Sequence, residues 1–328
     1  MYRIFTLNSP LNLLFYAIVL LALQVAWWAQ PIAENVVIEH AEPLSNLLFP
    51  KLQTLPNAKS VLQSLGLVLS LVIAIFLNNT IASNKILNSR SYTTGIFFII
   101  FLSLVRHFGV LSPELISVYF SLRIIQKALR IVKEEKPFGN IFDLGWISAL
   151  SVLFYFPSLW MLFFSFLILV VFRPFSLKEW LMVFIGFLAP FFFIFTLYFW
   201  FDKTHELLIG LTNLPNVQAR SFEFSPSVII AALVFVIAFL LSASALPRIL
   251  FSNVIQVRKF VNLLLIMIAL VLLSSFLQAE FTALHFSVLC LPLSILCAMY
   301  FQSLKGVFLS ELLFGMLILS AVIVHFFK

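Results

Sequence analysis

The sequence has few charged residues and few breaks in its apolar stretches. Charged residues make up 10% of the 328 positions, whereas 62% are hydrophobic and Phe alone occurs 40 times. A soluble domain usually has about a quarter charged residues, so an ordinary soluble protein is excluded. Because the apolar runs are continuous and do not alternate with polar residues, they favour spanning helices over a β-barrel. We therefore expect an all-α, polytopic membrane protein.

Motifs of soluble-enzyme chemistry are also missing. The sequence has no P-loop and no GxGxxG, GxSxG or HExxH motif. Its two cysteines, Cys290 and Cys297, share one apolar run without metal-ligand spacing, and we interpret them as packing residues. We expect no resident metal or cofactor, although a divalent ion stays open. The net charge of +7 comes from basic residues placed singly between apolar runs, which argues against nucleic acid as a partner.

Apolar runs separated by polar or Pro-containing breaks predict about eleven spans in a single integral membrane domain, residues 1–328. The first run has no convincing small-residue cleavage site, so we interpret it as a retained helix. The spans cover about residues 11–29, 61–78, 93–110, 113–130, 138–156, 158–173, 179–200, 227–246, 260–278, 284–303 and 307–326.

Basic residues predict the orientation, because cytoplasmic loops of membrane proteins are enriched in Lys and Arg. With the N-terminus inside, thirteen Lys and Arg residues face the cytoplasm, six face outside, and Arg123 lies within the membrane. We therefore expect a cytoplasmic N-terminus and an external C-terminus. The two longest loops, at about residues 30–60 and 201–226, then lie outside.

One stretch, SLRIIQKALRIVKEEK at residues 121–136, places Arg123, Lys127 and Arg130 on one helix face. Counted from Pro113, Arg123 lies about 15 Å into its helix, near the bilayer centre, where an isolated charge is costly. Two interpretations stay open. The three residues form a groove for lipid phosphate, to which the planar Arg guanidinium is suited, or they mark where the helix leaves the membrane.

The first outer loop is acidic. Its ENVVIEHAE stretch places Glu34, Glu39, His40 and Glu42 just after the first span. Carboxylates at the membrane boundary suit general-base catalysis on a lipid-linked substrate. We therefore predict Glu39 and Glu42 as catalytic residues and Glu34 as a secondary candidate, the alternative being a solvated acidic loop.

Four further polar residues in or near spans are secondary candidates. Arg106 and His107 precede the helix that starts at Pro113, while Glu280 and His285 flank the short outer turn before the tenth span.

The most distinctive stretch is FDLGWISALSVLFYFPSLWMLFFSFLILVVFRPFSLKEWLMVFIGFLAPFFF, residues 142–193. It resembles a family of multi-pass inner-membrane proteins of Bacteroidota whose function is unknown. That resemblance implies a multi-pass protein of a bacterial inner membrane, with its outer loops in the periplasm. The residues that carry it are Gly145, Phe154 to Pro157, Arg173 to Phe175, Lys178 to Trp180, Gly186 and Pro190.

A looser similarity, at the level of the fold, is to GT-C membrane glycosyltransferases, which use polyprenyl-phosphate sugars. Its basis is the many spans, the acidic first outer loop and the late LHFSVLCLP segment. The similarity implies a GT-C-like architecture in which Arg123, Lys127 and Arg130 steady the lipid phosphate and Glu42 or Glu39 activates the acceptor. The alternatives are a non-catalytic subunit or scaffold of an envelope assembly or secretion complex, with membrane-protein partners, and a lipid or solute transporter.

Overall fold

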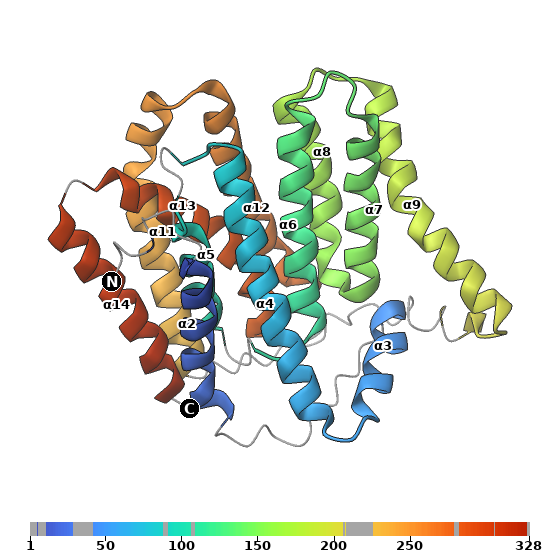
Figure 1. The fold of residues 1–328 in the computed structure, drawn as a ribbon. Helices are drawn as coiled ribbons and strands as arrows, with labels where there is room; N and C mark the ends of the chain where they lie inside the picture. Colours follow the sequence, from blue (N-terminus) through green and yellow to red (C-terminus); the bar gives the residue numbers. More distant parts are fainter. Residues whose placement is uncertain are drawn as a thin grey trace.

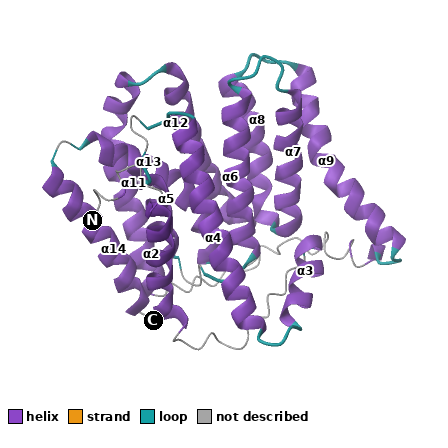
Figure 2. Cartoon of the chain, in the orientation of Figure 1, coloured by secondary structure: helices purple, strands orange, loops and turns teal. Residues whose placement is uncertain are grey.

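A computed structural model describes residues 5, 11–28, 42–87, 91–105, 109–205, 207, 226–278, 282–304 and 306–326. Within these ranges every regular element is a helix (Figure 2). The elements are α2 (Leu11–Trp28), α3 (Pro43–Gln53), α4 (Ala58–Ser83), α5 (Thr93–Ser103), α6 (Pro113–Ile131), α7 (Phe138–Phe154), η1 (Phe156–Leu159), α8 (Trp160–Phe172), α9 (Leu177–Trp200), α11 (Pro226–Ser252), α12 (Ile255–Ser274), η2 (Ser275–Leu277), η3 (Ala283–Leu289), α13 (Cys290–Ser303) and α14 (Val307–Phe326).

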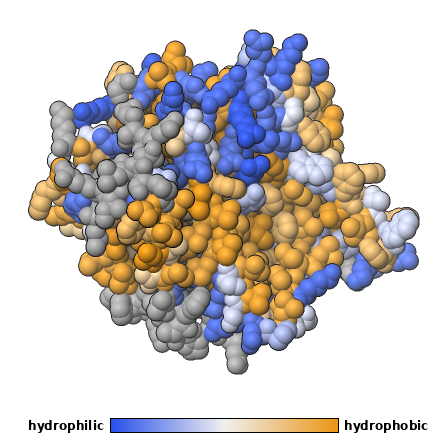
Figure 3. Space-filling view, in the orientation of Figure 1, coloured by the Kyte–Doolittle hydropathy of each residue, from blue (hydrophilic) through white to orange (hydrophobic). Residues whose placement is uncertain are grey.

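Six of the described helices are long and apolar enough to cross a membrane: α4, α9, α11, α12, α13 together with η3, and α14. The surface in Figure 3 carries a broad apolar belt with polar residues gathered above it. The prediction of an all-α membrane protein is confirmed. Each of the eleven predicted spans contains a helix, but the count of eleven is not confirmed. Helices α5, α7 and α8 and the Leu11–Gln24 part of α2 are apolar but shorter, and α6 carries too many charges.

Helix α5 shows why the count differs. All eleven of its residues are buried, and at 1.5 Å per residue it is about 17 Å long, roughly half the hydrocarbon thickness. It packs against α4 and α13 inside the protein. The described residues between α5 and α6, 104, 105 and 109–112, form no helix, and the Leu111 N–H donates to the Leu62 carbonyl of α4 at 2.9 Å. Such backbone is tolerated at membrane depth when protein surrounds it.

The helices form two groups (Figure 1). Helices α6 to α9 stand together on the right, α2, α5, α11, α13 and α14 stand on the left, and α4 and α12 lie between them. In the right-hand group α7 and α9 approach closely at two glycines. A Cβ added at Gly145 would lie 2.0 Å from the Val183 carbonyl oxygen, and one at Gly186 would lie 2.3 Å from that of Phe142. Only glycine permits this backbone contact.

The two ends of the molecule differ in charge. The loops after α4, α6, α8 and α11 lie at the upper end in Figure 1. These loops and the turns beside them contain Lys85, Lys133, Lys136, Arg173 and Arg258. Helix α3, the start of α6 and the end of α7 lie at the lower end.

Candidate functional site

Helix α3 brings a carboxyl group of the first loop to the end of α7. Pro43 occupies the first turn of α3, where the missing N–H costs nothing. The Ser45 hydroxyl donates to the Phe154 carbonyl at 2.5 Å, and the Tyr198 hydroxyl donates to the Pro43 carbonyl at 3.1 Å. These contacts hold Glu42 in place, and its Oε1 accepts a hydrogen bond from the Phe156 N–H at 3.1 Å.

Tyr155 follows the last residue of α7. Its extended backbone (φ −151°, ψ 103°) ends that helix, and Pro157 lies in the first turn of the short helix η1. The side chain is buried, and its hydroxyl lies 3.1 Å from His285 Nδ1 and accepts from Gln278 Nε2 at 3.0 Å. The Tyr155 hydroxyl is therefore hydrogen-bonded to two residues, Gln278 and His285, that are far from it in the sequence.

His285 continues this hydrogen-bonded chain into the protein. Its Nε2 lies 3.2 Å from the Val271 carbonyl and 3.0 Å from the Ser274 hydroxyl. Because a carbonyl can only accept, Nε2 carries the ring proton and Nδ1 accepts from the Tyr155 hydroxyl. An ordered relay of hydrogen bonds thus runs from Gln278 through Tyr155 and His285 to the Val271 carbonyl.

A second carboxyl group lies beside Glu42. Ser112 caps α6 by accepting from the Leu115 N–H at 3.2 Å, and Glu114 sits in the first turn, where the helix dipole favours an anion. Its side chain is 4% exposed. Glu42 and Glu114 lie close enough for their charges to repel each other, and both act on Tyr155.

We refer to five of these residues as the carboxyl cluster: Glu42, Glu114, Tyr155, Gln278 and His285. Burial raises the pKa of Glu42 above its usual 4.5, and the hydrogen bond from Phe156 offsets only part of this. The Tyr155 hydroxyl is buried and donates to His285 Nδ1, so it takes part in the cluster as a protonated phenol. A carboxylate made more basic, next to a protonated phenol on a histidine, is suited to accepting a proton from a substrate hydroxyl.

The predicted phosphate-binding residues lie elsewhere on α6. Arg123 is nine residues beyond Glu114, about 14 Å along the helix, and Lys127 and Arg130 are farther still. Arg123 donates to Gln126 at 2.7 Å, and Gln126 donates to Thr80 of α4 at 2.9 Å. The structure therefore does not bring this stripe together with Glu42, and phosphate binding by the stripe stays a prediction.

At the upper end the charges form an ionic network, defined here as Lys127, Glu134, Asn140, Asp143, Arg173 and Glu179. Lys127 Nζ lies 2.5 Å from Asp143 and 3.0 Å from Asn140, whose amide donates to Glu134 at 2.7 Å. Arg173 donates to both carboxylate oxygens of Glu179, at 2.9 and 3.3 Å, and to the backbone carbonyls of Glu134 and Glu135. The network ties α6, α7 and α9 together.

Of the other sequence-predicted site residues, only His285 is described. Glu34, Glu39, Arg106, His107 and Glu280 lie outside the described residues. No group of three or more His, Cys, Asp or Glu side chains in the described part of the chain is placed to hold a metal ion.

Sequence reasoning did not select Tyr155, Gln278 or Glu114 as site residues. Tyr155 lies in the FYFP turn, whose aromatic residues resemble the many others in the chain. A usable signal was the Ser112-Pro113-Glu114 helix start, because it fixes an acidic side chain at a helix end.

In the described part of the chain, fold and site together are those of a helical membrane protein, with six helices able to cross a bilayer and a largely buried carboxyl cluster near one end of them. Comparison of the sequence with models of known protein families and with curated proteins finds no match.

Proposed function

We propose that this protein is a bacterial inner-membrane glycosyltransferase that uses a polyprenyl-phosphate-linked sugar, with the carboxyl cluster as its active site. In this proposal the chain crosses the membrane about eleven times, with its N-terminus inside. The gathering of basic loops at the upper end supports the orientation, because Lys and Arg concentrate on the cytoplasmic side. The carboxyl cluster then lies on the outer side, where a sugar donor flipped across the membrane is found.

Glu42 is the general base of the proposed reaction. It removes the proton of an acceptor hydroxyl, whose oxygen attacks the anomeric carbon of the sugar. The bond from that carbon to the phosphate oxygen breaks, and polyprenyl phosphate leaves with the electron pair. The observation that carries the proposal is the placement of Glu42 beside Glu114 and the Tyr155–His285 relay. Two like charges held close in a buried site lower stability, and such arrangements concentrate at functional sites.

Arg123, Lys127 and Arg130 have a separate role in this proposal. Their distance along α6 keeps them from contacting a phosphate that lies next to Glu42. Lys127 is already paired with Asp143, and Arg123 with Gln126. Both pairings support the interpretation in which the stripe marks the inner end of the α6 span.

The test is transfer by purified protein in lipid nanodiscs. A panel of polyprenyl-phosphate-linked hexoses is supplied as donors, and release of polyprenyl phosphate is measured. Glu42→Gln keeps the shape and the hydrogen bond to Phe156 but cannot accept the proton, so transfer should fall about 10²–10⁴-fold, the range for a lost general base. The matched control is Glu134→Gln, a carboxyl group at the opposite end, which should transfer like wild type.

Full activity of Glu42→Gln would remove the cluster from the mechanism. No release from any donor by wild-type protein would favour the two other classes, a scaffold subunit or a transporter. A scaffold would tolerate Glu42→Gln in cells, whereas a transporter would move labelled lipid between the leaflets of a vesicle.

A further inference from the structure

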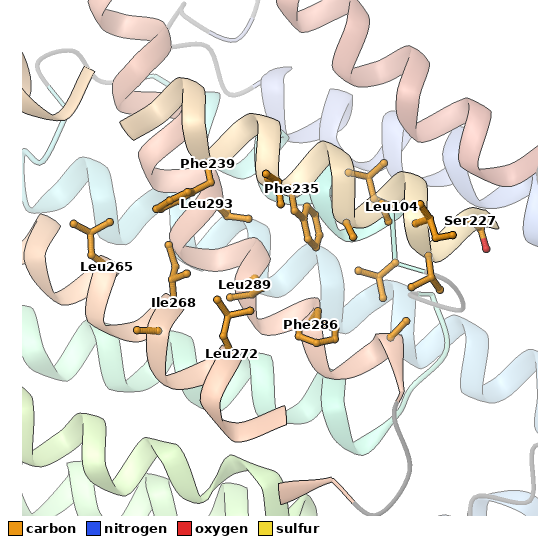
Figure 4. A pocket seen from close by; sticks show the side chains of 18 residues that line it. Leu104, Ser227, Phe235, Phe239, Leu265, Ile268, Leu272, Phe286, Leu289 and Leu293 are labelled. Atoms are coloured by element: carbon orange, nitrogen blue, oxygen red, sulfur yellow. The ribbon is translucent and has the colours of Figure 1, made fainter. Parts of the chain in front are cut away.

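An apolar groove of about 870 Å³ runs between α11 and α12 (Figure 4). Seventeen of its eighteen lining residues are apolar or small, the exception being Ser227 at the start of α11. From Ser227 to Phe239 the groove follows α11 for about 18 Å. Its volume is in the range of pockets that bury most of a bound molecule.

The groove is open toward the lipid and closed on the protein side. Phe235, Leu289 and Leu293 form a buried floor, whereas Ile229 and Val236 are more than half exposed. The surrounding outer face of α11, including Leu233 and Leu240, is apolar and exposed as well. The occupant must therefore be a hydrocarbon that enters from the bilayer.

Helix η3 separates the groove from the carboxyl cluster. In a 3₁₀ helix, side chains three residues apart lie in one row. The row of Ala283, Phe286 and Leu289 lines the groove, whereas the adjacent row contains Thr282 and His285, which contact Gln278 and Tyr155. One short helix thus has its apolar row on the groove and its polar row on the cluster.

At the end of α12, too, one side chain lines the groove and another contacts the carboxyl cluster. Leu272 lines the groove, and Ser274, two residues later, lies 3.0 Å from His285. The groove and the carboxyl cluster therefore lie on either side of η3 and the last turn of α12.

We propose that the groove between α11 and α12 holds the isoprenoid chain of the lipid donor, with its polar headgroup at the carboxyl cluster. This rests on the proposed function for the identity of the lipid. The groove is continuous and lined by the rings of Phe235, Phe239 and Phe286, an apolar surface against which the methyl-branched chain of the proposed donor packs.

The test uses binding and not turnover. Polyprenyl phosphate with a photoreactive diazirine on its chain is crosslinked to the protein in nanodiscs, and the labelled peptides are located by mass spectrometry. Label should concentrate in α11, α12 and η3. Ala232 and Ala269 line the groove and are exposed, so Trp at both positions fills it without disturbing the core. This double variant should lower the labelling about tenfold, the loss expected when a bulky ring fills a close-packed site.

The matched control is Ala22→Trp, an exposed alanine on α2 that does not line the groove, which should be labelled like wild type. Unlabelled polyprenyl phosphate should compete, and phosphatidylglycerol should not. Equal competition by phosphatidylglycerol, or unchanged labelling of the double Trp variant, would overturn the proposal. Labelling measures binding of the lipid chain and the transfer assay measures turnover, so the failure of the catalytic proposal and the failure of the groove proposal give different results.

Discussion

The carboxyl cluster holds like charges close together, whereas the ionic network pairs opposite charges. In the network Lys127 pairs with the partly exposed Asp143 and Arg173 with the buried Glu179, opposite charges held at 2.5 and 2.9 Å. In the cluster Glu42 and Glu114 are two carboxyl groups close enough to repel, and Glu114 is buried. The first arrangement stabilises the fold, whereas the second costs stability. If the proposed function holds, the contrast places the structural charges at one end of α6 and the active site at the other.

After the loss of Glu42 itself, the largest expected effect is that of Glu114→Gln. Glu114 is the first charged group acting on the Tyr155 phenol, on which Glu42 also acts, so loss of its negative charge should lower transfer on the order of 10²-fold. The same change removes the repulsion and should raise stability by about 0.5–2 kcal/mol. Thermal unfolding in detergent measures the change in stability, and the transfer assay measures the change in activity.

Replacing a residue of the ionic network should not lower transfer while raising stability. If Glu114→Gln lowers both transfer and stability, the proposed difference between the carboxyl cluster and the ionic network is wrong. The amide keeps the size of the carboxyl group, and folding of the variant is checked by size-exclusion chromatography.

Arg173→Met should have the next largest effect, and it should be on stability alone. Removing the guanidinium leaves the buried Glu179 carboxylate without its bidentate partner, which costs about 3 kcal/mol in buried pairs. Thermal unfolding measures the loss. Lys136→Met, an exposed basic residue at the same end, is the control and should change stability by less than about 0.5 kcal/mol. Transfer per folded molecule should not change, and its loss would assign the network a role in the reaction.

The pH dependence of stability distinguishes the two regions more finely. The pKa of Glu42 is raised in the folded protein, so the folded state holds this proton more tightly than the unfolded chain. The stability from Glu42 is therefore fully present below pH 4.5 and is lost as the pH rises through the folded-state pKa. Relative to wild type, Glu42→Gln should become more stable as the pH rises from 4.5 to about 8. Melting temperatures of both proteins across this range test it, and a constant difference would contradict the raised pKa.

Arg123→Leu should have the smallest effect. An apolar residue removes the cost of a charge in the membrane, and the guanidinium lies about 14 Å along α6 from Glu114. Transfer should stay within about twofold of wild type. The sequence-based prediction of a phosphate groove gives the opposite result, a folded protein without activity and with weakened binding of polyprenyl phosphate. The transfer and labelling assays decide between them.

Much of the helical structure could be predicted from apolar runs, because each of the eleven predicted spans contains a described helix. The role of α5 could not be predicted. A buried helix and a lipid-facing helix are equally apolar, and only packing shows that Thr93–Ser103 is enclosed by protein. The turn signals were more informative, since Ser112 and Pro113 correctly placed the start of α6.

The site could be predicted only in parts. Glu42 and His285 were candidates for separate reasons, one from an acidic loop and one from a polar residue near a span. Their connection through Tyr155 depends on how α3 docks onto the end of α7 and how η3 turns, and neither contact leaves a periodic pattern in the sequence. Long-range side-chain contacts of this kind follow from tertiary packing and not from local propensity.

The enclosed helix α5 also constrains how the protein is made. Its partner α13 begins at Cys290, so nearly 190 residues must be synthesised after Ser103 before the two can meet. At ribosomal speeds of 5–20 residues per second this takes about 10–40 s. During that interval a segment too short to cross the bilayer lacks half of its final surroundings. The nascent chain therefore needs the insertion machinery, or α2 and α4, to shelter α5 until the C-terminal third arrives.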